Sequence, residues 1–136
     1  MKELKLTASD ETLYTVLDEI RAYLTDSNCP EELMTPILIA AEEVYVNIAH
    51  YAYGGKTGEA KVDIDVTPDP KRCRIVFVDK GMPYNPLEKE DPDITLSADE
   101  RNIGGLGIFF VKEIMDSVKY EYRDGQNILT VEKSIG

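Results

Sequence analysis

Residues 36–53 are apolar around almost the whole circumference of a helix, and this feature constrains the fold more than any other. Ile, Leu, Val, Ala and Tyr occupy most positions between Pro36 and Tyr53. A helix of this kind has to be buried on most of its sides, because apolar surface left in water costs free energy. The sequence therefore predicts a deeply embedded helix.

The start of this helix has two candidate positions. Pro30-Glu-Glu can open it, and Thr35-Pro36 offers a second start, since proline is tolerated at the first helical position. On this basis the helix either begins at Pro36 or kinks there. Gly54-Gly55 is expected to end it.

The remaining periodicity predicts two more helices and five strands. In chain order we expect a strand at 3–6, a helix after Ser9, the buried helix, strands at 62–66 and 73–78, a helix at 108–115, and strands at 118–122 and 127–131. Asp124-Gly125 is a strong hairpin signal. These elements favour one α+β domain over residues 1–136, a two-layer sandwich in which a mixed, mostly antiparallel sheet carries three helices on one face.

Composition excludes several classes of function. The formal net charge of −11 opposes the phosphate backbone of nucleic acids, so we expect no direct nucleic-acid partner. No apolar run approaches the roughly 20 residues of a membrane span, and we expect no membrane contact. Cys29 and Cys73 lack metal-ligand spacing, which favours reduced thiols and a cytoplasmic protein.

Glu43 and Asn47 are two of the few polar residues on the buried helix. Four positions separate them, so they lie about 40° apart around the axis and stack on one side. Taken alone, such a pair is most simply explained by a capping hydrogen bond or a hydrogen bond between helices. His50 is the only histidine, which argues against a zinc site and against a Ser-His-Asp triad.

Two glycine-containing segments could accept a nucleotide. Asp79 closes a predicted strand, where its carboxylate could accept from the exocyclic amine of adenine while Gly81 leaves room for the ring. Gly104, Gly105 and Gly107 run into an apolar helix, whose N-terminus favours an anion. Each segment has a simpler alternative, an ordinary turn.

In this order, the three segments resemble the motifs of the GHKL (Bergerat-fold) ATP-binding superfamily. Residues 43–47 are similar to its N box, residues 79–83 to its first glycine box, and residues 104–107 to its second. The short chain, the Asp-x-Gly-x-Pro form and the Tyr-Asn-Pro that follows most resemble the anti-sigma-factor serine/threonine kinases of bacterial partner switching. The resemblance covers residues 5–133.

The resemblance implies ATP and Mg²⁺ as cofactors and a role for each matching residue. Glu43 would be the general base, Asn47 the Mg²⁺ ligand, and Arg101 a cation that neutralises the transferred phosphoryl group. Residues 80–103 would form a lid over ATP. The implied cofactor-binding residues are Asn47, Asp79, Gly81, Asn85, Gly104, Gly105, Leu106, Gly107 and Ile108.

The resemblance also implies protein partners. An anti-sigma-factor antagonist of the STAS type would be phosphorylated, a sigma factor could be a second partner, and a homodimer stays open. Two alternatives remain: a module that uses nucleotide only to switch partner binding, and a catalytic fragment of a two-component histidine kinase. The chain shows no upstream helix pair with a phosphorylatable histidine, which disfavours the fragment. Glu43 favours a kinase over the switch, because binding alone needs no base.

Overall fold

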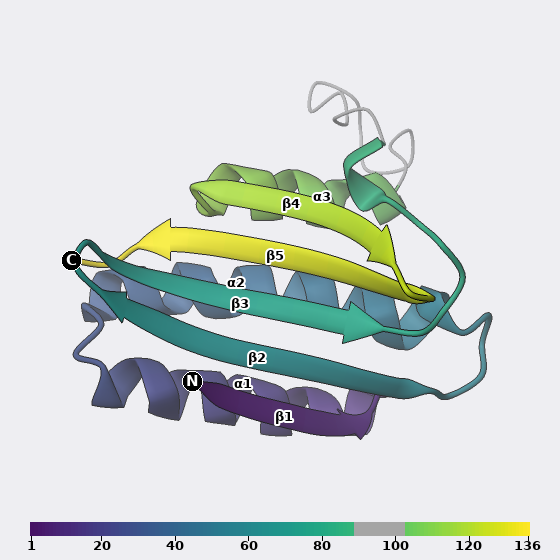
Figure 1. The fold of residues 1–136 in the computed structure, drawn as a ribbon, viewed down its shortest axis with the longest axis horizontal. Helices are drawn as coiled ribbons and strands as arrows, with labels where there is room; N and C mark the ends of the chain where they lie inside the picture. The colour runs from purple at the N-terminus through teal and green to yellow at the C-terminus, as the bar shows by residue number, and fades with distance from the viewer. Residues whose placement is uncertain (89–102) are drawn as a thin grey trace.

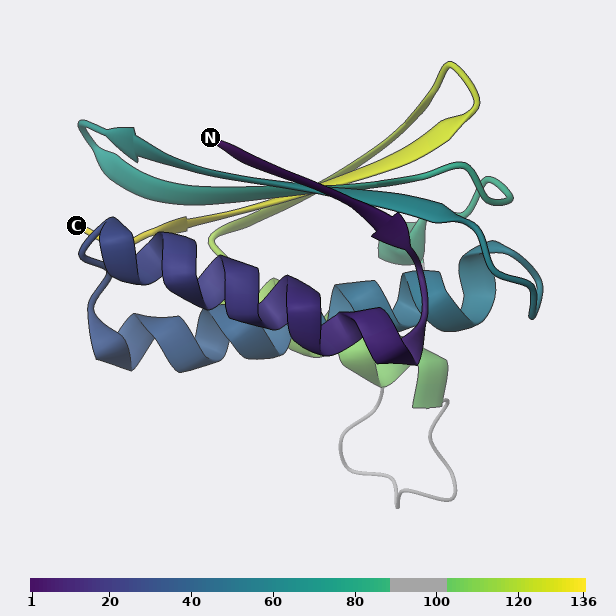
Figure 2. The same cartoon turned by 90° about the horizontal axis from the view of Figure 1, so that it is seen from below.

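The computed structural model describes residues 1–88 and 103–136, with only the backbone for residues 103–106. Five strands form one sheet, and three α-helices lie together on one side of it (Figure 1, Figure 2). The predicted α+β sandwich is confirmed. In one respect the expectation differs: every strand pair of the described sheet is antiparallel, so the sheet is not mixed.

The described elements follow the predicted order. The strands are β1 (Lys2–Thr7), β2 (Glu59–Pro68), β3 (Lys71–Asp79), β4 (Ser117–Arg123) and β5 (Gln126–Ser134). The helices are α1 (Asp10–Asp26), α2 (Glu31–Asn47) and α3 (Ile103–Ile114), with a π-helical turn η1 (Ile48–Ala52) and a 3-10 turn η2 (Pro86–Glu88). The sheet order is β1-β2-β3-β5-β4, and Asp124 and Gly125 turn the β4–β5 hairpin with φ values of 55° and 77°.

Helix α2 lies between α1 and α3 and is buried as expected (Figure 1). Tyr45 is fully buried, and its hydroxyl lies 2.6 Å from the hydroxyl of Thr12, which ties α2 to the start of α1. The residues of α2 that are buried are Met34, Ile37, Leu38, Ala40, Ala41, Val44 and Tyr45. They face α1, α3 and the inner face of the sheet, so this one helix joins both layers.

Both ends of α2 refine the prediction. The helix begins at Glu31 and runs through Pro36, so the later of the two candidate starts is wrong. At its other end, regular α-helix stops at Asn47 and continues as the π-helical turn η1, where one continuous helix to Tyr53 was expected. π-helical turns are rare and are often found at functional sites.

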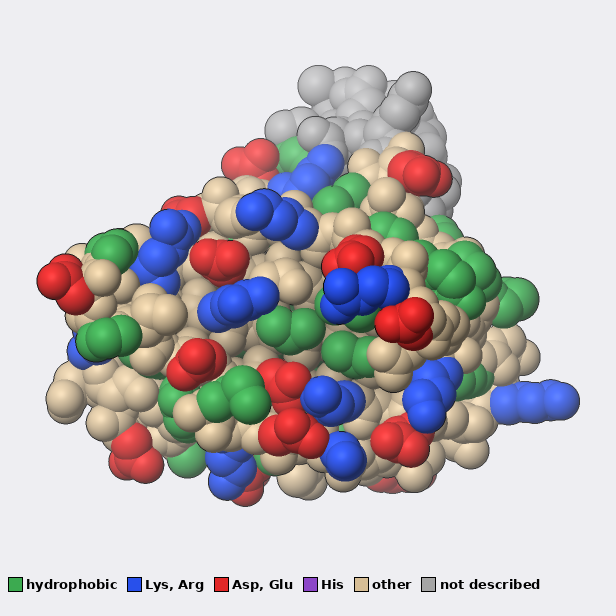
Figure 3. All heavy atoms as spheres, viewed as in Figure 1, with side chains coloured by type: hydrophobic (Ala, Val, Ile, Leu, Met, Phe, Trp, Pro, Cys, Tyr) green, Lys and Arg blue, Asp and Glu red, His purple; other side chains and the backbone are tan. Residues whose placement is uncertain are grey.

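The outer face of the sheet carries interspersed acidic and basic side chains (Figure 3). Lys61, for example, lies 3.4 Å from Asp63 and 3.9 Å from Glu3. Alternation along the strands therefore separates a charged outer face from an apolar inner one, as the period-two pattern predicted. Among the described residues, no helix is long and apolar enough to cross a bilayer.

The position of Pro36 generates a prediction about stability. A proline inside a helix has no amide to donate to the carbonyl four residues earlier, here that of Glu32. Pro36→Ala should therefore raise the free energy of unfolding by roughly 1–3 kcal/mol in urea titrations. Thr35→Ala, a change at the exposed neighbour, is the control and should shift it by only about 0.5 kcal/mol. A loss of stability in Pro36→Ala would show that the proline ring contributes more through packing than the missing bond costs.

Candidate active site

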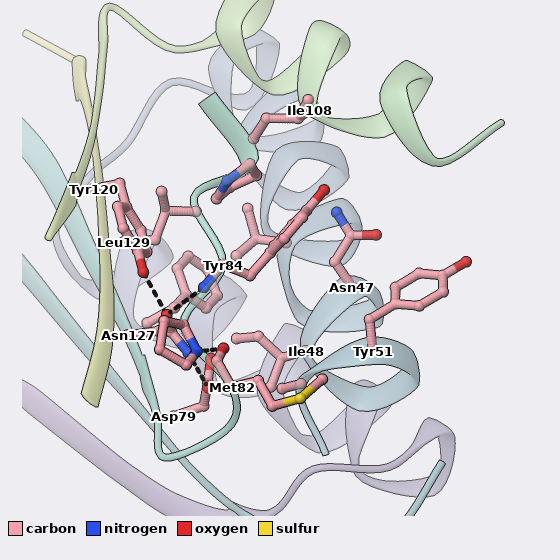
Figure 4. Close-up of a pocket in the computed structure, with 15 residues that line it drawn as sticks. Asn47, Ile48, Tyr51, Asp79, Met82, Tyr84, Ile108, Tyr120, Asn127 and Leu129 are labelled. Atoms are coloured by element: carbon pink, nitrogen blue, oxygen red, sulfur yellow. Dashed lines mark hydrogen bonds between the residues drawn. The ribbon is translucent and has the colours of Figure 1, made fainter. Parts of the chain in front are cut away.

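A cavity of about 400 Å³ lies between α2 with η1, the strands β3, β4 and β5, and the segment that follows β3 (Figure 4). Its size and its mainly apolar walls are typical of small-molecule sites. The apolar lining comes from Val44, Ile48, Ala52, Phe77, Ile108 and Leu129. Asn47 and Tyr51 lie on the helical side, while Asp79, Asn127 and Tyr120 lie on the side of the strands.

Asp79 is the carboxylate of this cavity, at the end of β3 and only 6% exposed. Its Oδ1 accepts hydrogen bonds from the backbone N–H of Gly81 and from the amide of Asn127, both at 2.9 Å. Its Oδ2 accepts no hydrogen bond from any residue that the structure describes. Asp79 therefore brings one free acceptor to a mainly apolar cavity, and such an acceptor can bind an amine.

Asn127, at the start of β5, joins Asp79 to the segment after β3 (Figure 4). Its Nδ2 donates to Asp79, to the carbonyl of Met82 at 2.9 Å and to that of Gly81 at 3.4 Å. Its Oδ1 accepts from the backbone N–H of Tyr84 at 3.1 Å and from the hydroxyl of Tyr120 at 2.5 Å. One 7% exposed side chain thus fixes five neighbouring groups.

Sequence reasoning missed Asn127 and Tyr120. The signal was present, because Asn127 alternates with the buried Leu129 and Val131 and therefore falls on the inner face of β5. A lone polar residue on an inward-facing position needs a partner. Tyr120 sits opposite Leu129 across the β4–β5 ladder and shares that face.

Gly81 of the first glycine box and Asn85, two residues after the box, contact other parts of the chain. A β-carbon at Gly81 would lie 2.0 Å from the carbonyl oxygen of Ala52, so glycine is needed there for close approach to η1. Asn85 accepts from the backbone N–H of Leu87 at 2.9 Å and thereby caps the turn η2. Neither residue lines the cavity, and their contacts with a nucleotide stay predictions.

Glu43 projects from α2 toward α3 and has no hydrogen-bond or ion-pair partner among the described residues. A β-carbon at Gly107 would lie 2.6 Å from Oε2 of Glu43, so the second glycine box and this carboxylate are in contact. Burial, and to a smaller extent the neighbouring Glu42 carboxylate, raises the pKa of Glu43 above its ordinary value. Glu43 is thus a half-buried carboxylate that no described residue compensates.

Asn47 lies one turn beyond Glu43 and lines the cavity. Its side-chain amide also has no hydrogen-bond partner among the described residues. The simpler alternative from the sequence, a capping hydrogen bond or a hydrogen bond between helices, is therefore wrong for both polar residues within the described part of the chain. Unpartnered polar groups that are half-buried on one helix are available to a ligand.

The other predicted residues belong to α3 or to the segment before it. Gly104, Gly105 and Leu106 form the first turn of α3, which therefore starts before the glycines rather than after them. Ile108 is 3% exposed and lines the cavity. Arg101 and residues 89–102 of the predicted lid lie outside the described residues. Within residues 1–88 and 103–136, no group of three or more His, Cys, Asp and Glu side chains is placed to hold a metal ion by itself.

Comparison with known proteins defines the class of this protein. The sequence profile of the family described as "Histidine kinase-like ATPase domain" matches residues 6–133. The chain belongs to this family, which confirms the superfamily inferred from the three motifs.

The similar proteins found by sequence comparison are named as protein kinases. A serine/threonine-protein kinase, BtrW of Bordetella bronchiseptica, is 25% identical over 95 residues, which are 70% of this chain and 66% of that protein. The serine-protein kinase RsbW of Bacillus pumilus is 25% identical over 131 residues, covering 93% of this chain and 81% of the relative. The serine-protein kinase RsbW of Listeria monocytogenes is 27% identical over 103 residues, which are 72% of this chain and 64% of that relative.

A solved structure shares the fold. The crystal structure of the RsbU and RsbW domains of a Mycobacterium tuberculosis protein superposes with a TM-score of 0.68 at 15% identity. The match covers 99% of this chain and 33% of the solved one. The described helices and strands therefore have the arrangement found in that larger protein.

The environment of Glu43 predicts a pH-dependent stability. Because the pKa of Glu43 is raised in the folded state, its contribution to stability is present below its unfolded-state pKa and is lost as the pH rises through the folded-state pKa. Glu43→Gln cannot ionise, so at about pH 7 it should unfold at higher urea concentration than the wild type, and this difference should shrink toward about pH 4.

The matched control is Glu32→Gln, which alters an exposed carboxylate in the first turn of the same helix. The unfolding curve of Glu32→Gln should lie closer to that of the wild type than the curve of Glu43→Gln does, at both pH values. If Glu43→Gln is instead less stable than the wild type at neutral pH, the carboxylate stabilises the fold through an interaction that is absent from its described contacts.

Proposed function

We propose that this protein is an anti-sigma regulatory kinase, which transfers the γ-phosphoryl group of ATP to a serine or threonine of an anti-sigma-factor antagonist. The observation that carries the proposal is the carboxylate of Glu43, half-buried, without a partner among the described residues, and in contact with the glycine box at Gly107. The family and the names of the relatives support the same reaction.

The cavity fits the adenine of ATP. Its volume of about 400 Å³ suits a nucleoside, and its apolar walls can cover the faces of a base. Asp79 lines this cavity, and its Oδ2 accepts no hydrogen bond from a described residue, while adenine offers an exocyclic amine as donor. We therefore assign the base to Asp79, with Ile48, Phe77 and Leu129 among the walls.

The phosphate end of the site would lie where α2 and α3 meet. Mg²⁺ usually takes only one or two oxygen ligands from protein and the rest from phosphates and water, so the amide oxygen of Asn47 suffices without a larger cluster. The first turn of α3, with Gly104, Gly105 and Leu106, offers backbone N–H groups to an anion. Bound Mg-ATP would supply the phosphoryl group and the metal charge.

Glu43 would act as the general base. A base works best when its pKa lies near the working pH, and burial raises the pKa of Glu43 in that direction. Its carboxylate is free to accept the proton of a serine or threonine hydroxyl from the partner protein. Transfer should then decline as the pH falls below the raised pKa, because the protonated carboxyl can no longer accept.

Several parts of the proposal rest on resemblance. They are the STAS-type antagonist as substrate, a sigma factor as second partner, a homodimer, a cytoplasmic location, the lid at residues 80–103, and Arg101 as the cation beside the transferred group. The second candidate is a module that binds nucleotide only to switch partner affinity. Glu43 favours the kinase, because a module that only binds nucleotide has no need of a base.

The deciding experiment compares Glu43→Gln with Asn47→Ala. Glutamine keeps the shape of the side chain but accepts no proton, so phosphorylation of the antagonist should fall by about 10²–10⁴-fold. Affinity for Mg-ATP, measured by calorimetry, should stay close to that of the wild type. Asn47→Ala should show the reverse order, with Mg-ATP affinity lost first. Full transfer by a stably folded Glu43→Gln protein would instead support the switch module.

Gly107→Ala tests the contact between the glycine box and the base. Gly107 has no left-handed φ, so alanine fits the backbone and should keep or raise stability, by up to about 1 kcal/mol. Its β-carbon would displace the Glu43 carboxylate, and transfer should fall by about 10²-fold. Adding Gly107→Ala to Glu43→Gln should cost little more, because the base is already absent. Unimpaired transfer in the single variant would mean that the position of the carboxylate does not matter.

A further inference from the structure

We propose that Asn127 is the positioning residue for nucleobase selectivity, because it holds Asp79 and the wall of the cavity in one arrangement that accepts adenine and rejects guanine. The inference rests on the proposed binding of ATP and assigns its base selectivity to a second residue. Asn127 comes from β5, distant in sequence from the three motifs, and reaches Asp79 at 2.9 Å (Figure 4).

The hydrogen bonds of Asn127 permit one orientation of its amide. Nδ2 faces three acceptors, which are Oδ1 of Asp79 and the carbonyls of Gly81 and Met82. Oδ1 faces the N–H of Tyr84, a donor that cannot reverse. Turning the amide over would set an oxygen against three acceptors and an NH₂ group against that N–H, so the network itself fixes the assignment.

This orientation determines what Asp79 offers to a base. Its Oδ1 is occupied by the N–H of Gly81 and by Asn127, while Oδ2 has no donor among the described residues. A lone acceptor can bind the 6-amino group of adenine but is repelled by the 6-carbonyl of guanine. Asn127 keeps the carboxylate from rotating, so the acceptor stays where the base must meet it.

Asn127 also holds the wall opposite α2. It binds the backbone at positions 81, 82 and 84, and the side chains of Met82 and Tyr84 line the cavity. A second anchor acts on the same segment, because the N–H of Met82 donates to the carbonyl of Ala52 at 3.1 Å. Without Asn127, the wall would lose the bonds at positions 81, 82 and 84 that tie it to β5, while the bonds from Gly81 to Asp79 and from Met82 to η1 would remain. The base site would then be less firmly shaped on the side of the strands.

The test measures Mg-ATP and Mg-GTP affinities by calorimetry on the full chain. Asn127→Leu keeps the volume but removes every hydrogen bond, and it should reduce the preference for ATP over GTP by about 10- to 100-fold. Asn127→Asp sets a carboxylate against Asp79 and two carbonyls, so it should bind ATP more weakly than Asn127→Leu. Urea unfolding of each variant shows which proteins are folded.

Tyr120 and Tyr122 supply a matched pair on β4. The hydroxyl of Tyr120 donates to Asn127, whereas Tyr122 is 45% exposed and donates no hydrogen bond to a described residue. Tyr120→Phe removes one of the bonds that hold the amide, and it should lower the ATP:GTP ratio severalfold with the fold intact. Tyr122→Phe should leave the ratio at the wild-type value. If Asn127→Leu does not fold, this pair of variants shows whether the hydrogen bonds of Asn127 determine the ATP:GTP affinity ratio.

The outcomes separate the two levels of the proposal. If Asn127 had a purely structural role, its loss would lower the affinities for ATP and GTP by the same factor. An unchanged ATP:GTP affinity ratio in folded Asn127→Leu therefore overturns the inference but not the proposed function. If Asn127→Leu does not fold, an unchanged ratio in Tyr120→Phe does the same. A wild-type protein that binds no ATP at millimolar concentration overturns the proposed function and the inference with it. A ratio that falls in Asn127→Leu and Tyr120→Phe but not in Tyr122→Phe supports Asn127 as the positioning residue.

Discussion

Burial of α2 is the constraint on which the rest of the structure depends. Seven of its residues are buried between α1, α3 and the sheet, and each large apolar side chain contributes roughly 1.5–3 kcal/mol. This contribution offsets the cost of a half-buried carboxylate and a half-buried amide on the same helix. Glu43 and Asn47 can therefore remain without protein partners among the described residues while the helix that carries them stays fixed.

Two glycines bring other segments against this helical unit. Gly107 lets α3 approach the Glu43 carboxylate, and Gly81 lets the segment after β3 approach the carbonyl of Ala52 in η1. In both places a β-carbon would occupy space that another part of the chain already fills. The two glycine boxes thus set distances between chain segments around the cavity, in addition to any contact with a ligand.

Periodicity made most of this fold predictable, because burial acts on each element separately. The inner and outer positions of β2 alternate as expected, and the φ values of Asp124 and Gly125 produce the expected hairpin. The motifs correctly indicated the family. Three of the residues that they singled out, Asn47, Asp79 and Ile108, line one cavity in the structure.

What the sequence did not reveal depends on contacts between distant segments. The π-helical turn lies where the carbonyl of Ala52 accepts from the N–H of Met82, thirty positions later, and no local pattern encodes that bond. The partner of Asp79 is likewise 48 positions away, at Asn127. Pro36 inside α2 shows the same effect in reverse, since tertiary burial overrides a local signal for a helix start.

The two ends of the candidate site, one at Asp79 and the other at Glu43 and Asn47, differ in how far protein contacts hold their polar side chains in place. At Asp79, the protein itself supplies hydrogen bonds from Gly81 and Asn127, and Tyr84 and Tyr120 in turn donate to Asn127. Under the proposed function, the base would therefore meet a preformed surface. Glu43 and Asn47 have no protein partners among the described residues, so under the proposed function their order would depend on the metal, the phosphates and the partner's hydroxyl. A ligand that satisfies such groups stabilises the folded state through its own binding free energy. Under the proposed function, the described part of the chain would fix the base end of the site by itself, and the ligand and the partner would complete the order at Glu43 and Asn47.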